Sequence, residues 1–228
     1  MTERRPQGLA RFLREPVNSL THFAGILLSV AGLVALLVLS AGEPWRTVSF
    51  AVYGGALVLL YTASTLLHAL RVGAEGQRRL RLLDHAAIFV LIAGSYTPIA
   101  LVTLQQRSAA WGWGVFGAAW GIALLGIVFK LFWLEAPRWL STALYLLMGW
   151  LALAAVGPIV QTLPPGGIFW LVAGGLFYSV GAVVYGLKKP DWFPGRLGYH
   201  ELWHLFVLAG SACHFVMMLR FVLPTPPA

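Results

Sequence analysis

Long apolar runs alternate with short polar connectors along almost the whole chain. Seven of these runs have about the 20 mostly apolar residues that a helix needs to cross a bilayer. They cover Val17–Ser40, Thr47–Leu70, Leu82–Leu104, Ala109–Phe129, Trp139–Val160, Ile168–Leu187 and Leu197–Leu219. The pattern predicts an all-α membrane protein, a bundle of seven transmembrane helices over residues 17–222. Residues 1–16 are expected to form a short basic tail, and residues 223–228 a disordered one.

The composition excludes a soluble globular protein. Of 228 residues, 59% are hydrophobic and 11% are charged, whereas soluble domains are about 25% charged. The net charge of +8 does not indicate nucleic-acid binding, because the basic residues lie between the apolar runs and form no surface cluster. The single cysteine, Cys213, excludes an intrachain disulfide and is expected to be a small buried hydrophobic residue.

The distribution of basic residues predicts how the bundle lies in the membrane. Thirteen of the sixteen Lys and Arg residues fall in the amino-terminal tail and in the second, fourth and sixth connectors. These segments lie on one side, and the positive-inside rule places that side in the cytoplasm. We therefore predict a cytoplasmic amino terminus and a carboxyl terminus outside.

Ionisable residues inside the runs are the candidates for function, because each costs a few kcal/mol in a bilayer. The predicted topology brings most of them to one depth near the cytoplasmic face. This polar layer consists of His22, His68, Asp84, His85, His200 and His204. His214 lies ten residues beyond His204, about 15 Å farther along its helix, and is expected to be a packing or substrate-pocket residue.

Spacing within the polar layer indicates a metal site. His200 and His204 are four residues apart, as are Ser64 and His68, so each pair shares a helix face. Three imidazoles that leave a fourth position to water are typical of a catalytic zinc site. We predict Zn²⁺ ligation by His68, His200 and His204, with His22 and His85 as hydrogen-bonding groups around the ligands.

Simpler interpretations of the same residues stay open. A membrane histidine is often a hydrogen-bonded packing residue, and Asp84 could cap its helix. Glu201 points away from the His200 and His204 face and is expected to be an interfacial residue that reaches toward water. Gly117 and Gly121 form a GxxxG motif, for which we favour internal helix packing over a dimer face.

Several motifs together resemble the hemolysin III family of bacterial membrane proteins, within the progestin and adipoQ receptor superfamily. They are Glu15-Pro-Val-Asn18-Ser-Leu-Thr-His22, Ser64-x-x-x-His68, Leu83-Asp84-His85, Gly94-Ser-Tyr-Thr-Pro98 and Gly198-Tyr-His200-Glu-Leu-Trp-His204. The superfamily is related to alkaline ceramidases, and the resemblance implies zinc on three histidines with a serine and an aspartate beside the metal water. Those positions are Ser64 and Asp84 here. It also implies hydrolysis of a lipid amide such as ceramide.

These inferences favour a zinc-dependent intramembrane hydrolase of a lipid amide or ester in the bacterial cytoplasmic membrane. Asp84 would accept the water proton, and Ser64 would orient the water or stabilise the oxyanion. Two alternatives are a non-enzymatic sensor or regulator of membrane lipid with a structural zinc, and a proton-coupled transporter. The family name implies haemolysis, but a chain of seven spans does not indicate a released toxin. A membrane lipid is the expected partner, with the oligomeric state left open.

Overall fold

The computed structural model describes residues 12–193 and 197–225, and in them seven helical segments are long and apolar enough to cross a membrane. Four are single helices: α1 (Pro16–Leu39), α2 (Pro44–Ala69), α4 (Ala109–Phe132) and α7 (Pro165–Leu187). The other three are composite: α3 (Ala74–Pro98) with η2 (Ile99–Thr103) and η3 (Leu104–Gln106), α5 (Arg138–Gly149) with η4 (Trp150–Ala155) and α6 (Val156–Thr162), and α8 (Tyr199–Met217) with η5 (Met218–Val222). The predicted all-α, seven-span architecture is confirmed. Most of the predicted tails, residues 1–11 and 226–228, lies outside the described residues.

Local sequence explains where several helices begin. Proline occupies the first turn of α1, α2 and α7, where its missing N–H is not needed and its fixed φ suits a helix. At the start of α8, the Glu201 carboxylate accepts a hydrogen bond of 2.9 Å from the Gly198 backbone N–H. Glu201 is therefore a capping residue, which is a different role from the interfacial one expected from sequence.

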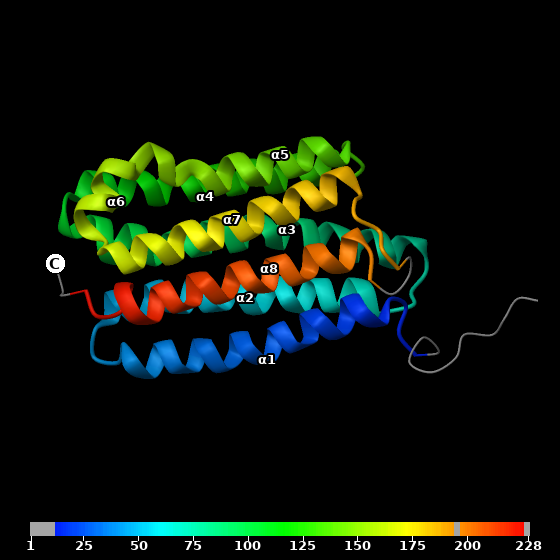
Figure 1. Cartoon of the computed structure of the whole chain (residues 1–228), viewed down its shortest axis with the longest axis horizontal. Coiled ribbons are helices and arrows are strands. Elements are labelled where there is room, and N and C mark those ends of the chain that lie inside the picture. Colours follow the sequence, from blue (N-terminus) through cyan, green and yellow to red (C-terminus); the bar gives the residue numbers. More distant parts are fainter. Residues whose placement is uncertain (1–11, 194–196, 226–228) are drawn as a thin grey trace, which may run out of the picture.

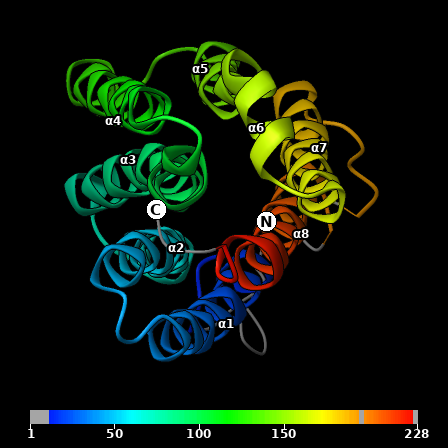
Figure 2. The same ribbon diagram turned by 90° about the vertical axis from the view of Figure 1, so that its left-hand side faces the viewer.

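The helices form a ring when viewed along the bundle (Figure 2). Helices α1, α2, α3 and α4 contact one another in sequence order, α8 packs on α1, α7 packs on α8, and α5 contacts α7. Successive spans run in opposite directions (Figure 1). The beginnings of α1, α3, α5 and α8 therefore meet the ends of α2, α4 and α7 at one end of the bundle, which we name the basic end after its Lys and Arg residues.

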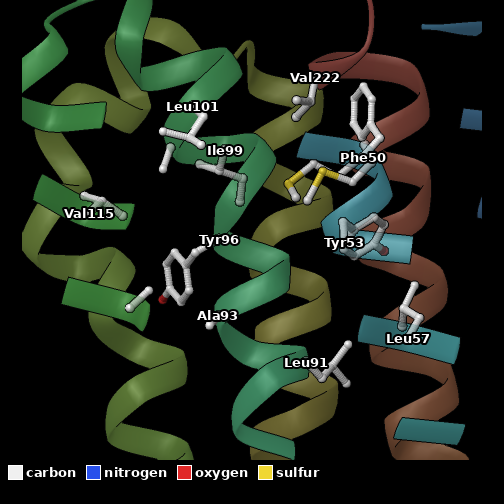
Figure 3. Close-up of a cluster of buried hydrophobic side chains, with 14 of the residues drawn as sticks. Phe50, Tyr53, Leu57, Leu91, Ala93, Tyr96, Ile99, Leu101, Val115 and Val222 are labelled. Carbon is white, nitrogen blue, oxygen red and sulfur yellow. The ribbon is translucent and has the colours of Figure 1, made fainter. Parts of the chain in front are cut away.

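The hydrophobic core is centred on α2 and α3. In the most apolar stretch of each, 56% and 78% of residues are buried, against 28% in α1 and in α4. Figure 3 shows Phe50, Tyr53 and Leu57 of α2 in this cluster with Tyr96 of α3 and Ile99 of η2. The outer helices instead expose large aliphatic side chains, as a surface in contact with lipid requires.

The fifth span is interrupted where proline prevents a continuous helix. Pro158 lacks a backbone N–H, and its ring clashes with the carbonyl four residues earlier; the 3-10 segment η4 lies just before it. Tyr96 compensates for part of the disruption. Its hydroxyl donates to the Gly149 carbonyl at 2.6 Å and accepts from the Ala152 N–H at 2.8 Å. A neighbouring helix thus satisfies backbone groups that lipid cannot.

Two expectations are wrong: one about the face of α4 that packs against other helices, and one about where α3 begins. No neighbour lies within 4 Å of a Cβ placed at Gly117 or Gly121, so this GxxxG motif faces outward and does not serve internal packing. Helix α3 begins at Ala74, not at Leu82, because its polar first turns continue the helix beyond the apolar run. Asp84 therefore lies ten residues inside α3 and cannot cap it.

Lys130 also differs from its expected place. Its charge suggested a connector, but it lies in the last turn of α4 with only 1% of its surface exposed. A hydropathy pattern ends a span at the first charged residue, whereas a helix continues wherever that charge finds polar contacts in the protein. Arg138 is likewise the first residue of α5 and not part of a loop.

The Tyr96 bridge gives a stability prediction. Tyr96→Phe leaves the Gly149 carbonyl and the Ala152 N–H without their partner in an apolar span, which should cost about 1–3 kcal/mol and lower the thermal unfolding midpoint in detergent. Tyr53→Phe is the matched control, because its buried hydroxyl has no hydrogen-bond partner among the described residues. That variant should unfold at the wild-type temperature or above it. Equal midpoints for the two variants would show that the bridge does not support the interrupted span.

Candidate metal centre

Three histidines converge at the basic end of the bundle. His68 lies in the last turn of α2, and His200 and His204 lie one turn apart at the start of α8. Each offers a ring nitrogen, and the three nitrogens lie within 4.8 Å of one another. His68 and His204 are buried, with 3% and 2% of their surface exposed. The structure thus brings together the three residues that the sequence selects as metal ligands.

A carboxylate holds the first of these rings. Glu15, just before α1, lies 2.6 Å from Nδ1 of His68. This contact engages Nδ1 and leaves Nε2 to face a metal, an arrangement common where a carboxylate supports a zinc-bound imidazole. Burial tends to raise the pKa of Glu15, but the hydrogen bond and charge of His68, with contributions from Asn18 and Arg14, outweigh it and lower the pKa to about 2.

Backbone contacts fix Glu15 in this position. The Glu15 N–H donates to the His68 carbonyl at 2.9 Å, and the Arg14 N–H donates to the Ala69 carbonyl at 3.2 Å. The segment that leads into α1 is therefore bonded to the end of α2. Sequence analysis assigned no role to Glu15; the signals were a carboxylate directly before the proline that begins a span and its place in a family motif that also contains His22.

His22 packs directly on the cluster. Its ring stacks on that of His204 with 3.7 Å between centroids and 14° between planes, and it meets Tyr61 edge-on at 5.0 Å. The stacking limits rotation of the His204 ring. His22 therefore lies beside the proposed ligands, where the sequence predicts it, although its expected role as a hydrogen-bonding group stays a prediction.

Ser64 and Asp84 form a second polar pair in the same region. The Ser64 hydroxyl lies close enough to the Asp84 carboxylate to stabilise its charged form, and both residues line the cavity that His68, His200 and His204 also line. Ser64 precedes His68 by one helical turn. An acid and a hydroxyl thus lie beside the three imidazoles, on α3 and α2 respectively.

The other two histidines lie apart from the cluster. The backbone carbonyl of His85 accepts a hydrogen bond of 3.2 Å from the Tyr145 hydroxyl. The Nε2 atom of His214 lies 3.2 Å from the Leu171 carbonyl, and the His214 ring packs closely on Gly174. Both line the cavity, and His214 occupies the deeper position expected from its place in the sequence.

The cavity joins this polar region to an apolar interior. Its volume is about 660 Å³, within the usual range for small-molecule sites. The deeper wall is aliphatic and includes Leu91, Ile92, Ile159, Ile168 and Leu171. A molecule with a polar group near the histidines and a hydrocarbon chain below them matches this distribution.

The residues present fit a transition metal. Tetrahedral zinc with nitrogen ligands at about 2.0–2.1 Å places those nitrogens about 3.3 Å apart, so small ring rotations bring the three imidazoles onto one ion. Neutral imidazole ligands supported by a carboxylate suit Zn²⁺ and other borderline metals. The three-histidine cluster can therefore bind a metal ion.

Sequence comparison agrees with the motifs. The family described as "Haemolysin-III related" matches residues 10–215 of this chain. The chain belongs to this haemolysin-III-related family. The match includes His68, His200 and His204 and the Ser64 and Asp84 pair. It confirms the family resemblance found from the motifs.

Individual relatives extend over nearly the whole chain. It is 39% identical over 228 residues to Hemolysin-3 of Bacillus cereus, with 99% of each protein covered. It is 41% identical over 214 residues to the Hemolysin-3 homolog of Bacillus subtilis (strain 168), with 93% of this chain and 96% of the relative covered. The human Monocyte to macrophage differentiation factor is 26% identical over 214 residues, with 92% and 84% covered. With its seven apolar helices, this haemolysin-III-related chain is a multi-pass protein of the cell membrane.

The Glu15 contact predicts an effect on metal affinity. Glu15→Gln removes the negative charge that supports His68, and loss of such a contact typically weakens metal binding 10–100-fold. We expect about a tenfold loss, measured by competition with a chelator. Glu43→Gln is the matched control, because Glu43 also precedes the proline that begins a helix, α2, at the opposite end of the bundle. Equal affinities for the two variants would contradict a supporting role for Glu15.

Proposed function

We propose that this haemolysin-III-related protein is a zinc-dependent intramembrane hydrolase of a lipid amide or ester. One observation carries the proposal: three imidazoles and a serine–aspartate pair line the same cavity, whose deeper wall is aliphatic. The imidazoles can hold the ion, the pair can handle a proton, and the apolar wall can accept a hydrocarbon chain.

Each polar residue has a distinct task in the proposed reaction. His68, His200 and His204 would hold the zinc, which when bound lowers the pKa of its water and polarises the substrate carbonyl. Asp84 would accept the water proton and return it to the leaving amine or alcohol. Ser64 would orient the water or donate a hydrogen bond to the developing oxyanion. Glu15 would keep His68 in the required tautomer.

A structural metal is the second candidate. His68 belongs to α2, whereas His200 and His204 belong to α8, so one ion would cross-link two spans that are distant in sequence. A sensor or regulator of membrane lipid needs such a cross-link but no turnover. The proton-coupled transporter receives less support, because the described acids and histidines, Glu43 and His214 excepted, gather at the basic end, and His214 alone extends the series inward.

Metal content and turnover, measured together, test the proposal. Protein purified without chelator should carry about one zinc per chain by elemental mass spectrometry, and His68→Ala and His204→Ala should lose it. Asp84→Asn should keep zinc but hydrolyse N-acyl long-chain amines or acyl esters about 10²–10⁴-fold more slowly, with release of fatty acid as the readout.

The control is His214→Asn, which changes a cavity histidine outside the cluster and should keep its zinc. Bound zinc without hydrolysis of any amide or ester would favour the structural role. Absence of a bound transition metal in the wild type would overturn the zinc site altogether. Equal turnover in wild type and Asp84→Asn would remove the aspartate from the mechanism.

A further inference from the structure

Lys130 is a buried cation that forms no ion pair with an acid among the described residues; Glu135 acts on it only from a longer distance. Its ammonium donates to the Ser141 hydroxyl at 2.5 Å and to the Leu134 carbonyl at 3.4 Å, and in the part of the chain that the structure describes it forms no ion pair. Two neutral oxygens satisfy two of its three donors. A buried charge normally needs a counter-ion, because desolvation costs several kcal/mol.

Arg138 is half-buried and likewise forms no ion pair among the described residues. Its guanidinium lies over the Tyr185 ring at 4.6 Å and near the Tyr199 ring at 5.6 Å, so aromatic faces hold it in place. Its Nη1 atom is buried and has no hydrogen-bond partner among the described residues. A guanidinium fixed in this way keeps an unused donor for an anion.

The two cations belong to one site. Ser141, which binds Lys130, lies three residues after Arg138 and therefore on the same face of α5. Lys130, Arg138 and Ser141 all line the cavity described above. The last turn of α4 and the first turn of α5 thus present two positive charges and a hydroxyl to the same space, at the basic end of the bundle.

The carboxylates that line this cavity interact mainly with other groups. Glu15 forms ion pairs with His68 and Arg14, Glu135 forms one with Arg81 at 3.1 Å, and Asp84 interacts with Ser64. Glu135 also acts on Lys130 through its charge, from beyond ion-pair distance. None of them is paired with Lys130 or Arg138. A ligand can therefore supply a negative charge that no ion pair within the described residues provides.

We propose that Lys130, Arg138 and Ser141 bind the phosphate monoester group of a single-chain lipid, whose hydrocarbon chain occupies the aliphatic part of the cavity. Two cations that form no ion pair among the described residues match a phosphate monoester, which carries about −1.5 to −2 charges at pH 7. A carboxylate or a phosphodiester would supply only one negative charge. The aliphatic residues Leu91, Ile92, Ile159 and Leu171 line the same cavity and suit the chain.

This binding site does not depend on the proposed hydrolase. None of its three residues is a candidate metal ligand or part of the Ser64 and Asp84 pair. Binding can therefore be measured without zinc and without turnover, and His204→Ala should lose zinc yet keep the phosphate site. Failure of the hydrolase proposal would leave this one intact.

The test is binding of hexadecyl phosphate to the full chain in detergent, counted by native mass spectrometry. The wild type should bind one molecule. Lys130→Gln and Arg138→Gln should each raise the dissociation constant about tenfold or more, because each removes a charge-assisted hydrogen bond. Lys130→Arg should recover part of the affinity. Arg79→Gln is the control, since Arg79 is 77% exposed and paired with Glu75, and it should bind as the wild type does.

Two further ligands separate the sources of affinity. Hexadecanol has the chain without the phosphate, and inorganic phosphate has the anion without the chain; both should bind at least tenfold more weakly than hexadecyl phosphate. Equal binding of hexadecanol, or wild-type affinity in folded Arg138→Gln, would overturn the anion site. Equal binding of inorganic phosphate would overturn the lipid assignment. Thermal unfolding of each variant identifies a folded sample, and Arg138→Gln tests the site if Lys130→Gln does not fold.

Discussion

Inside a bilayer no water is present to satisfy a polar group, and the organisation of this protein follows from that constraint. A polar side chain in the spans is stabilised when it finds a partner within the protein or lies where a polar ligand can reach it. Tyr96 satisfies the backbone of the interrupted fifth span, Ser64 pairs with Asp84, and Glu15 with His68. Most of these contacts join different helices, so they also determine which helices are neighbours.

The same constraint explains why the polar residues gather at one end. Antiparallel packing places the end of α2 beside the start of α8 and the end of α4 beside the start of α5. Histidines collect at the first junction, and Lys130 and Ser141 meet at the second. Both junctions open on one cavity. Its polar groups are thus concentrated where head groups of the membrane lie, and its aliphatic wall extends toward the bilayer centre.

Much of this could be predicted from the sequence because the signals are strong and local. About 20 apolar residues specify a span, and four-residue spacing places His200 and His204 on one face. The direction of successive spans then brings His68 to the same depth. Partners that meet only in three dimensions were missed. Glu15 contacts a residue 53 positions away, and the burial of Lys130 depends on Ser141 in the next helix. The outward-facing Gly117 and Gly121 show the same limit, because a motif does not specify which side of its helix meets a neighbour.

The division of the histidine cluster between the second and the last spans has a consequence for biosynthesis. As the chain leaves the ribosome, α2 enters the membrane early, whereas α8 is inserted last. A nascent chain with six spans already contains Glu15, His68 and the junction of α4 with α5, yet it lacks two of the three imidazoles. The cluster is completed only when translation has passed the first turns of α8, so a chain terminated before His200 contains one of the three imidazoles.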